Sequence, residues 1–257
     1  MRISLMQYPL VWADIRENLT VWEQRLAPLA DKTDVVVLPE MFTTGFCTDD
    51  MYLAEDMQGS TVRKLKEWSC KYGFALVGSF MAKEDARIYN RAFFVEPDGT
   101  CSYADKRHLF SMGGEHQYLS AGDKRLIVNY KGVRFCVLVC YDLRFPVWAR
   151  NVDNAYDVLV YVANWPEQRI RDWDILLTAR AVENQAYVCA VNRVGDDGRN
   201  LHYNGHSALI DYRGNKVVCF EDNEEAVKSG EMDMDGLHRG REKFPIWKDA
   251  DDFQIIE

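Results

Sequence analysis

The chain has 257 residues, of which 47% are hydrophobic and 12% aromatic, and it carries a formal net charge of −9 at pH 7. Its length and apolar content suffice for one large α/β domain or two smaller ones, but an acidic chain without clustered lysine and arginine is a poor candidate for binding nucleic acid. No apolar run approaches the roughly 18 residues of a membrane span, and the N-terminus lacks a signal-peptide core, so we expect a cytoplasmic protein that does not enter membranes.

Strand and helix patterns alternate through the first part of the chain. Short apolar runs bounded by turn residues indicate strands, and apolar residues at helical spacing indicate amphipathic helices that begin near Asp14 and Ser60. The pair Asp98-Gly99 is typical of a hairpin turn. We therefore expect strands at residues 2–10, 34–40, 74–82, 87–97 and 100–105, and helices at 14–30 and 60–73.

A turn-rich stretch without regular periodicity, residues 106–123, separates these elements from a second group. Loops of this length in compact domains are usually functional or disordered, and the aromatic and methionine content of this one argues against disorder. Beyond it we expect strands at residues 125–130, 133–140, 155–164, 186–195 and 205–221, and helices at 145–151 and 172–185.

No linker or change in composition divides the chain. We therefore expect a single domain over residues 1–257, of the α/β class, with helices on the outer faces of two groups of strands. The acidic tail at residues 248–257 is expected to pack on another surface, such as a second subunit.

The seven cysteines are odd in number and irregular in spacing, which argues against a disulfide framework. Cys136 and Cys140 are four residues apart in one expected strand, a separation of roughly 13 Å, so they cannot pair there. The chain has neither a CxxC nor an HExxH sequence, and we expect no metal. It has no P-loop or GxGxxG sequence either, and we expect no cofactor.

Cys140 ends the apolar pattern at 133–140, directly before a charged segment that contains Pro146. One interpretation is that Cys140 is a buried thiol that acts as a small hydrophobic residue. The other is that the strand ends in order to present a nucleophile at a sharp turn, with the backbone N–H of Tyr141 directed at the same reacting atom. The second interpretation requires a base that takes the thiol proton.

Glu40 and Lys106 also stand where a strand gives way to a loop, which is where reactive side chains gather in α/β proteins. Glu40 follows Val-Val-Val-Leu-Pro, and a partly desolvated carboxylate suits a group that takes a proton and returns it. An ammonium at Lys106 would lower the pKa of the thiol and stabilise a tetrahedral oxyanion. Taken alone, Glu40 could be a helix cap and Lys106 an ordinary solvated side chain.

Three segments resemble, in sequence and in order, the signature segments of the nitrilase or carbon–nitrogen hydrolase superfamily. They are VVVLPEMFTTGF at 35–46, DKRHLF at 105–110 and LVCYDLRFP at 138–146. The resemblance covers essentially the whole chain, and it implies a triad of Glu40, Lys106 and Cys140, a four-layer αββα sandwich of the nitrilase type and a homodimer. It also matches Glu115, in GGEH, to a second family carboxylate that supports the lysine or positions the substrate.

Within the superfamily, residues 164–185 and the GEHQYLSAG segment at 114–122 are most similar to bacterial omega-amidases. The resemblance implies hydrolysis of the terminal amide of 2-oxo acid amides such as 2-oxoglutaramate and 2-oxosuccinamate, through a cysteine thioester. It also implies a place in methionine salvage and keto-acid amide clearance. The alternatives are an amidase for deaminated glutathione or N-carbamoyl amides, and a catalytically inactive binding module on the same fold.

A 2-oxo acid amide carries a carboxylate far from its scissile bond, so the pocket requires a cation. Arg144, four residues after the expected nucleophile, is the candidate, because a guanidinium binds a carboxylate through two hydrogen bonds. The alternative for Arg144 is a structural ion pair with Asp142 or with a glutamate. The aromatic candidates for the pocket wall, each of which could instead belong to the core, are Phe42, Phe110, Trp165 and Trp173.

Overall fold

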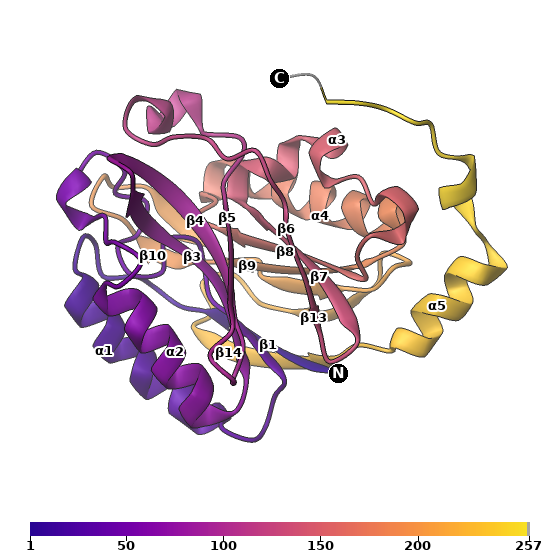
Figure 1. Ribbon diagram of the computed structural model, residues 1–257, viewed down its shortest axis with the longest axis horizontal. Helices are drawn as coiled ribbons and strands as arrows, with labels where there is room; N and C mark the ends of the chain where they lie inside the picture. Colours follow the sequence, from indigo (N-terminus) through magenta and orange to yellow (C-terminus); the bar gives the residue numbers. More distant parts are fainter. Residues whose placement is uncertain (256–257) are drawn as a thin grey trace.

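The computed structural model describes residues 1–255, which form two six-stranded sheets packed face to face (Figure 1). The first sheet has the strand order β14-β1-β2-β3-β4-β5, and the second has the order β13-β12-β9-β8-β7-β6. The strands of the first sheet are β1 (Arg2–Gln7), β2 (Val35–Val37), β3 (Ala75–Glu84), β4 (Arg87–Val95), β5 (Cys101–Asp105) and β14 (Ala226–Glu231). Those of the second are β6 (Leu126–Tyr130), β7 (Val133–Val139), β8 (Val158–Ala163), β9 (Tyr187–Asn192), β12 (Ala208–Ile210) and β13 (Lys216–Cys219).

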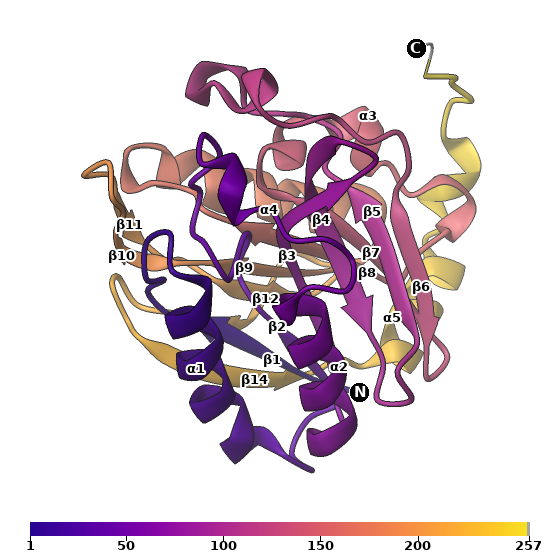
Figure 2. The same ribbon diagram turned by 60° about the vertical axis from the view of Figure 1, so that its left-hand side comes forward.

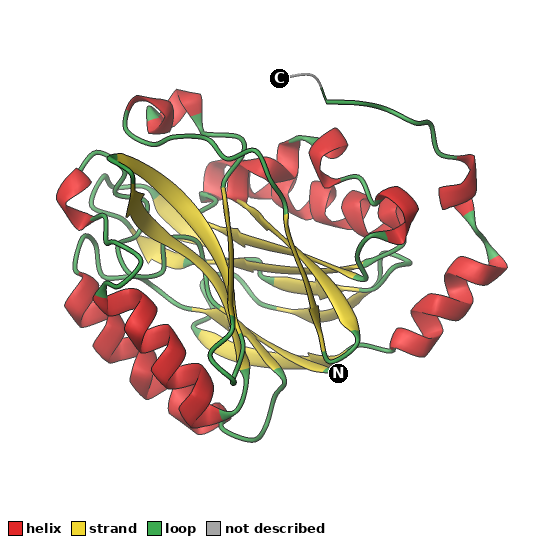
Figure 3. Ribbon diagram, in the orientation of Figure 1, coloured by secondary structure: helices red, strands yellow, loops and turns green. Residues whose placement is uncertain are grey.

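Helices cover the outer side of each sheet, so the predicted four-layer α/β sandwich is confirmed (Figure 3). The helices α1 (Ile15–Leu26) and α2 (Ser60–Tyr72) lie side by side against the first sheet, as Figure 2 shows. The short α3 (Pro146–Ala149) and the longer α4 (Ile170–Asn184) pack on the second sheet. The last helix, α5 (Met234–Lys243), follows β14.

Local sequence explains where the first two helices begin and end. The Asp14 carboxylate accepts the backbone N–H of Glu17 at 2.9 Å, which satisfies one of the unpaired donors at the start of α1. The helix α2 ends at Gly73, whose φ of 75° is accessible to glycine without strain. Trp22 and Trp68 are fully buried on the inner faces of these helices, and this burial anchors them to the sheet.

The central strands of both sheets are parallel, which explains their continuous apolar sequences. β1, β2 and β3 pair in parallel in the first sheet, and β7, β8 and β9 do so in the second. All residues of β2 and β8 are buried, as expected for strands covered on both faces. The carboxyl ends of β2, β7 and β8 therefore provide rigid positions for the polar residues that follow them.

Several elements were absent from the sequence-based prediction, and several boundaries differ. The expected strand at 34–40 ends at Val37, so Glu40 lies in the turn that follows β2. The expected strand at 186–195 is divided into β9 and β10 (Val194–Asp196), and the prediction lacked β11 (His202–Asn204), β14 and α5. The sequence of β14, AVKSGE, has little apolar content, and it is a strand because it pairs with β1.

The C-terminal tail runs past α5 through a short 3₁₀ turn at Ile246–Asp249 into an exposed segment without regular structure. The last two residues of the segment expected to pack on another surface, 256 and 257, lie outside the described residues. Within the described residues, none of the helices combines the length and the apolar character that crossing a bilayer requires.

Candidate active site

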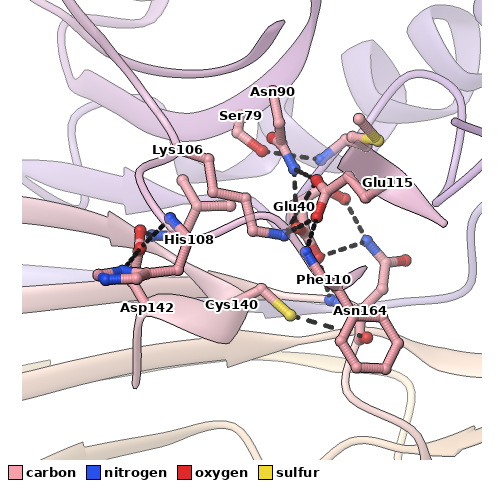
Figure 4. Close-up of polar contacts among 12 residues, drawn as sticks. Glu40, Ser79, Asn90, Lys106, His108, Phe110, Glu115, Cys140, Asp142 and Asn164 are labelled. Carbon is pink, nitrogen blue, oxygen red and sulfur yellow. Dashed lines mark hydrogen bonds and ion pairs between the residues drawn. The ribbon is translucent and has the colours of Figure 1, made fainter. Parts of the chain in front are cut away.

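Polar side chains from both sheets meet at the carboxyl ends of the central strands (Figure 4). Glu40 follows β2, Lys106 follows β5, and Cys140 follows β7. Asn164 follows β8, and Glu115 lies in a 3₁₀ turn within the long loop after β5. The structure thus brings together the three residues of the expected triad and the second carboxylate, although they are far apart in the sequence.

A sharp turn presents Cys140 at the end of β7. Cys140 has a φ of 47°, in the left-handed region that residues other than glycine rarely adopt, and it begins a 3₁₀ turn at Cys140–Arg144. The Asp142 carboxylate stabilises this turn, because it accepts the backbone N–H groups of Val139 and His108, each at 3.0 Å. The sulfur of Cys140 lies 3.9 Å from the carbonyl oxygen of Asn164, on the side of the polar cluster (Figure 4).

Glu40 is fully buried, and hydrogen bonds to both of its carboxylate oxygens fix the orientation of its side chain. Oε1 accepts hydrogen bonds from Lys106 Nζ at 3.0 Å and from Asn90 Nδ2 at 2.8 Å. Oε2 accepts the backbone N–H of Asn164 at 2.8 Å and its Nδ2 at 3.2 Å. The four donors hold this buried carboxylate in one orientation.

Lys106 lies between two carboxylates. Its Nζ is 2.9 Å from Oε2 and 3.1 Å from Oε1 of Glu115, in addition to its bond with Glu40. Burial disfavours the charge of Lys106, but Glu115 and Glu40 outweigh burial and raise the pKa of the ammonium above its ordinary value. Lys106 is therefore a permanent cation. Burial raises the pKa of Glu115, and Lys106 only partly offsets that effect.

The Cys140 thiol is protonated at neutral pH. Burial and the negative charge of Glu40 raise its pKa well above the ordinary value, and the opposing effect of Lys106 is smaller. The sequence-based expectation that Lys106 lowers the pKa of the thiol is thus right for the lysine alone and wrong for the net shift. A protonated thiol is a weak nucleophile, so its reaction requires a base that removes the proton during attack.

A cavity of about 90 Å³ opens beside Cys140. Lys106, Tyr141 and Asn164 line it near the thiol, and Phe110 and Trp165 contribute aromatic walls. Three arginines, Arg144, Arg169 and Arg199, also line this cavity. No three histidine, cysteine or acidic side chains are grouped as a possible metal site within residues 1–255. The cavity thus combines a thiol, a buried carboxylate, an ammonium and several guanidinium groups.

Comparison with known proteins places this arrangement in a family. The model of the carbon–nitrogen hydrolase family matches residues 2–242. The chain belongs to the carbon–nitrogen hydrolases. It is 44% identical to the omega-amidase YafV of Escherichia coli K12, over 99% of this chain and 98% of that protein. It is 34% identical to the 2-oxoglutaramate amidase of Bacillus subtilis strain 168, over 96% of each. This carbon–nitrogen hydrolase is therefore an amidohydrolase of the omega-amidase or nitrilase type.

Solved structures agree with this assignment. A crystal structure of a carbon–nitrogen hydrolase superfamily protein from Xanthomonas campestris, with an arsenic adduct in its active site, matches 99% of this chain and 98% of that one with a TM-score of 0.97 and 42% identity. The nitrilase superfamily protein Nit3 of Saccharomyces cerevisiae matches 96% of this chain and 94% of that one with a TM-score of 0.85 and 26% identity. The nitrilase-type fold expected from the resemblance is confirmed.

Some of the residues that were expected to bind substrate line the cavity of this carbon–nitrogen hydrolase, and others lie in its core. Tyr141, Arg144, Trp165 and Phe110 line the cavity. Arg144 pairs with Asp172 at 2.8 Å, whereas Asp142, the partner considered from the sequence, contacts His108 instead. Arg144 is thus both a cavity residue and a member of an ion pair.

Phe42 does not reach the cavity, which corrects the expectation that it binds substrate. It is fully buried in the core beneath α1, where its ring centroid is 6.4 Å from Trp22 and 5.7 Å from Phe93. Trp173 is also fully buried, with its ring 5.4 Å from that of Trp165, so it supports a wall residue from behind.

The sequence analysis missed two residues that hold Glu40, namely Asn90 and Asn164. Asn164 directly follows β8, so the rule that singled out Glu40 and Cys140 applies to it equally. Asn90 lies within β4, and its signal is an uncharged amide in a strand that is mostly buried. A buried polar residue in such a strand requires a partner, which here is the Glu40 carboxylate.

Proposed function

We propose that this carbon–nitrogen hydrolase is an omega-amidase that hydrolyses the terminal amide of 2-oxo acid amides, such as 2-oxoglutaramate and 2-oxosuccinamate. The observation that carries the proposal is the small cavity beside Cys140, because its wall contains three guanidinium groups. A short amide with a carboxylate at its far end matches this combination of size and charge. The names of the relatives from Escherichia coli and Bacillus subtilis support the same substrate class.

The first step is the attack of Cys140 on the amide carbon. Glu40 takes the thiol proton as the sulfur–carbon bond forms, since the thiol is protonated at rest. Lys106 and the backbone N–H of Tyr141 stabilise the negative oxygen of the tetrahedral intermediate. Glu40 then returns the proton to the nitrogen, ammonia leaves, and a thioester remains on Cys140.

The second step is hydrolysis of the thioester. Glu40 is ionised again after ammonia leaves, and it removes a proton from a water molecule that attacks the thioester carbon. As the second tetrahedral intermediate collapses, Glu40 gives this proton to the departing Cys140 sulfur, and the carboxylic acid that forms ionises to give the 2-oxo dicarboxylate. Glu115 acts through Lys106, because its carboxylate lies 2.9 Å from the ammonium and keeps it beside Glu40 throughout the cycle.

The charges at the cavity also favour a 2-oxo acid over the related amino acid. Glutamine carries an α-ammonium next to its carboxylate, and Arg144, Arg169 and Arg199 would repel that ammonium. In 2-oxoglutaramate a neutral oxygen replaces the ammonium, and this oxygen can accept a hydrogen bond from a guanidinium.

The experiment is a measurement of ammonia release from 2-oxoglutaramate, glutamine, a simple nitrile and an N-carbamoyl amino acid. We expect strong preference for 2-oxoglutaramate and no turnover by Cys140→Ala. Cys136→Ala is the matched control, because Cys136 lies four residues earlier in β7, is fully buried and does not line the cavity. Preference for another substrate would replace this proposal, and silence on all four with an unreactive Cys140 would indicate a binding module.

The biological setting rests on the resemblance to omega-amidases alone. We propose a cytoplasmic homodimer that removes the 2-oxo acid amides left by glutamine- or asparagine-dependent transamination, including in methionine salvage. Light scattering after size-exclusion chromatography would give about twice the 29.8 kDa mass of the chain for such a dimer.

A further inference from the structure

The three arginines of the cavity differ in their partners. Arg144 pairs with Asp172, and Arg199 pairs with Asp49. Arg169 has no carboxylate within 4.0 Å in the described part of the chain, and its guanidinium makes no hydrogen bond to any residue there. Arg169 therefore presents five N–H donors, none of which has an acceptor among the described residues, at the wall of the cavity that contains Cys140.

Arg169 is nevertheless held in a defined place. It precedes α4, its backbone N–H donates to the carbonyl of Pro166 at 3.0 Å, and its own carbonyl accepts Nε1 of Trp165 at 2.7 Å. Its guanidinium carbon lies 5.2 Å from the centre of the Phe110 ring, a distance at which the ring face attracts the cation. This contact orients the side chain without using its donors.

The carboxylates around the cavity already accept hydrogen bonds from other protein groups. Asp197 also lines the cavity, but its oxygens accept the backbone N–H groups of Arg199 and Leu201, at 2.7 and 3.0 Å, and the Tyr203 hydroxyl at 2.9 Å. Glu40 and Glu115 are bound to Lys106. A carboxylate that enters the cavity must compete with Asp172 for Arg144, whereas it meets the donors of Arg169 unopposed.

We propose that Arg169 is the residue that selects an anionic substrate, by binding the carboxylate at the end of the substrate remote from the scissile amide. This inference rests on the proposed function for the identity of the substrate, but it requires only that the amide be anionic. Arg144, stacked over Trp165 at 4.8 Å and paired with Asp172, then forms the fixed neighbouring wall.

The test compares 2-oxoglutaramate with an uncharged amide of the same chain length in Arg169→Gln. Loss of a charge-assisted hydrogen bond is expected to raise KM for the anionic amide about 10- to 100-fold, with little change for the uncharged amide. Arg171→Gln is the matched control, since Arg171 is exposed and lies two residues later, in the first turn of α4 but outside the cavity. Arg169→Lys, which keeps the charge without the planar fork, should restore part of the affinity.

A second measurement needs no turnover. Calorimetry should show that the dicarboxylate product 2-oxoglutarate binds Cys140→Ala about 10- to 100-fold more tightly than it binds the double variant Cys140→Ala/Arg169→Gln. Equal affinities, or a loss of anion preference in Arg144→Gln but not in Arg169→Gln, would overturn the proposal. An enzyme that prefers uncharged amides and does not bind the dicarboxylate would overturn it as well. Preference for a different anionic amide, still dependent on Arg169, would reject only the proposed substrate.

Discussion

Two buried ion-pair clusters lie at opposite ends of β8, and only one of them adjoins the reactive cavity. The cluster after β8 contains Glu40, Lys106 and Glu115, so that two carboxylates share one ammonium. The cluster before β8 is centred on Asp157, whose carboxylate binds Arg134 at 2.8 Å and Arg241 at 2.7 Å. The first cluster has two carboxylates for one cation, and the second has two cations for one carboxylate.

The two clusters differ in the ratio of cations to carboxylates and in whether a cavity adjoins them, and these two features distinguish the reactive cluster from the structural one. Around Asp157 two guanidiniums serve one carboxylate, and Arg241 also donates to the carbonyls of Tyr156 and Gln185, each at 2.8 Å. Burial alone would raise the pKa of Asp157, but its bonds with Arg134 and the charge of Arg241 hold the pKa below its ordinary value. Around Lys106 the pKa of Glu115 is raised instead, and a thiol adjoins the cluster at an open cavity.

The largest effect is expected from Asp157→Asn. Removing one partner of a buried ion pair leaves guanidinium charge uncompensated, so the free energy of unfolding should fall by about 3–5 kcal/mol. Asp34→Asn, which removes a partly exposed carboxylate paired with Lys131, should cost at most about 1 kcal/mol. Urea denaturation measures both, and a loss of activity in folded Asp157→Asn would contradict a purely structural role.

This effect depends on pH in a defined direction. The pKa of Asp157 is lowered in the folded state, so its stabilising contribution is complete above the unfolded value of about 4 and is lost as the pH falls through the folded value. The difference in melting temperature between the wild type and Asp157→Asn should therefore be largest near pH 7 and shrink on acidification below about pH 4.

Lys106→Met is expected to reduce kcat about 100- to 1000-fold, which corresponds to the loss of one oxyanion donor, about 2.7–4 kcal/mol. Methionine keeps most of the length of the side chain and removes its charge and its N–H donors. Lys131→Met is the control, because Lys131 pairs with Asp34 on the surface and is remote from the cavity. If Lys106→Met kept its kcat and only unfolded more easily, then Lys106 would be structural, as the arginines around Asp157 are.

Asn90→Ala should have a smaller effect that acts through Glu40. Asn90 donates to Glu40 at 2.8 Å, and a hydrogen bond to a charged group contributes about 1.5–3 kcal/mol, so kcat should fall about 10- to 100-fold. KM should stay constant, because Asn90 does not line the cavity. Asn129→Ala, at an exposed position of β6, serves as the control, and a change in KM alone would count against a positioning role.

The smallest expected effect is a shift in the alkylation profile of Cys140. Because burial and Glu40 raise the pKa of the thiol, alkylation by iodoacetamide should keep rising above pH 8. Glu40→Gln removes the negative charge while Lys106 remains, so the midpoint of the profile should move to lower pH. Mass spectrometry of the peptide that contains Cys140 measures this rate. A shift to higher pH would show that Glu40 does not raise the pKa of the thiol.

The sequence predicted the positions of Glu40, Lys106 and Cys140 because a simple rule applies to them. Glu40 and Cys140 follow apolar parallel strands at the centre of the two sheets, which bring such positions to one end, and Lys106 follows the edge strand β5. The prediction that Phe42 lines the cavity was wrong. The chain turns at Met41, whose φ is 45°, and Phe42 packs in the core although it is only two residues from Glu40.

Ion pairs and strand pairs between segments that are far apart in the chain could not be predicted from the sequence. Arg169 and Arg144 both occur in charged segments. Only the structure shows that Asp172 pairs with Arg144 and that Arg169 has no carboxylate partner among residues 1–255. The strand β14 has no apolar pattern of its own, and its pairing with β1 joins residues more than 200 positions apart, such as Arg2 and Glu231.

The pairing of β1 with β14 has a consequence for synthesis of the chain on the ribosome. β1 emerges more than 200 residues before β14, yet they are neighbours in one sheet. Until residues 226–231 have been translated, one edge of β1 exposes unpaired backbone groups, which is the kind of edge through which nascent chains aggregate. The first sheet of this enzyme is therefore completed only after the other five of its strands have already been translated.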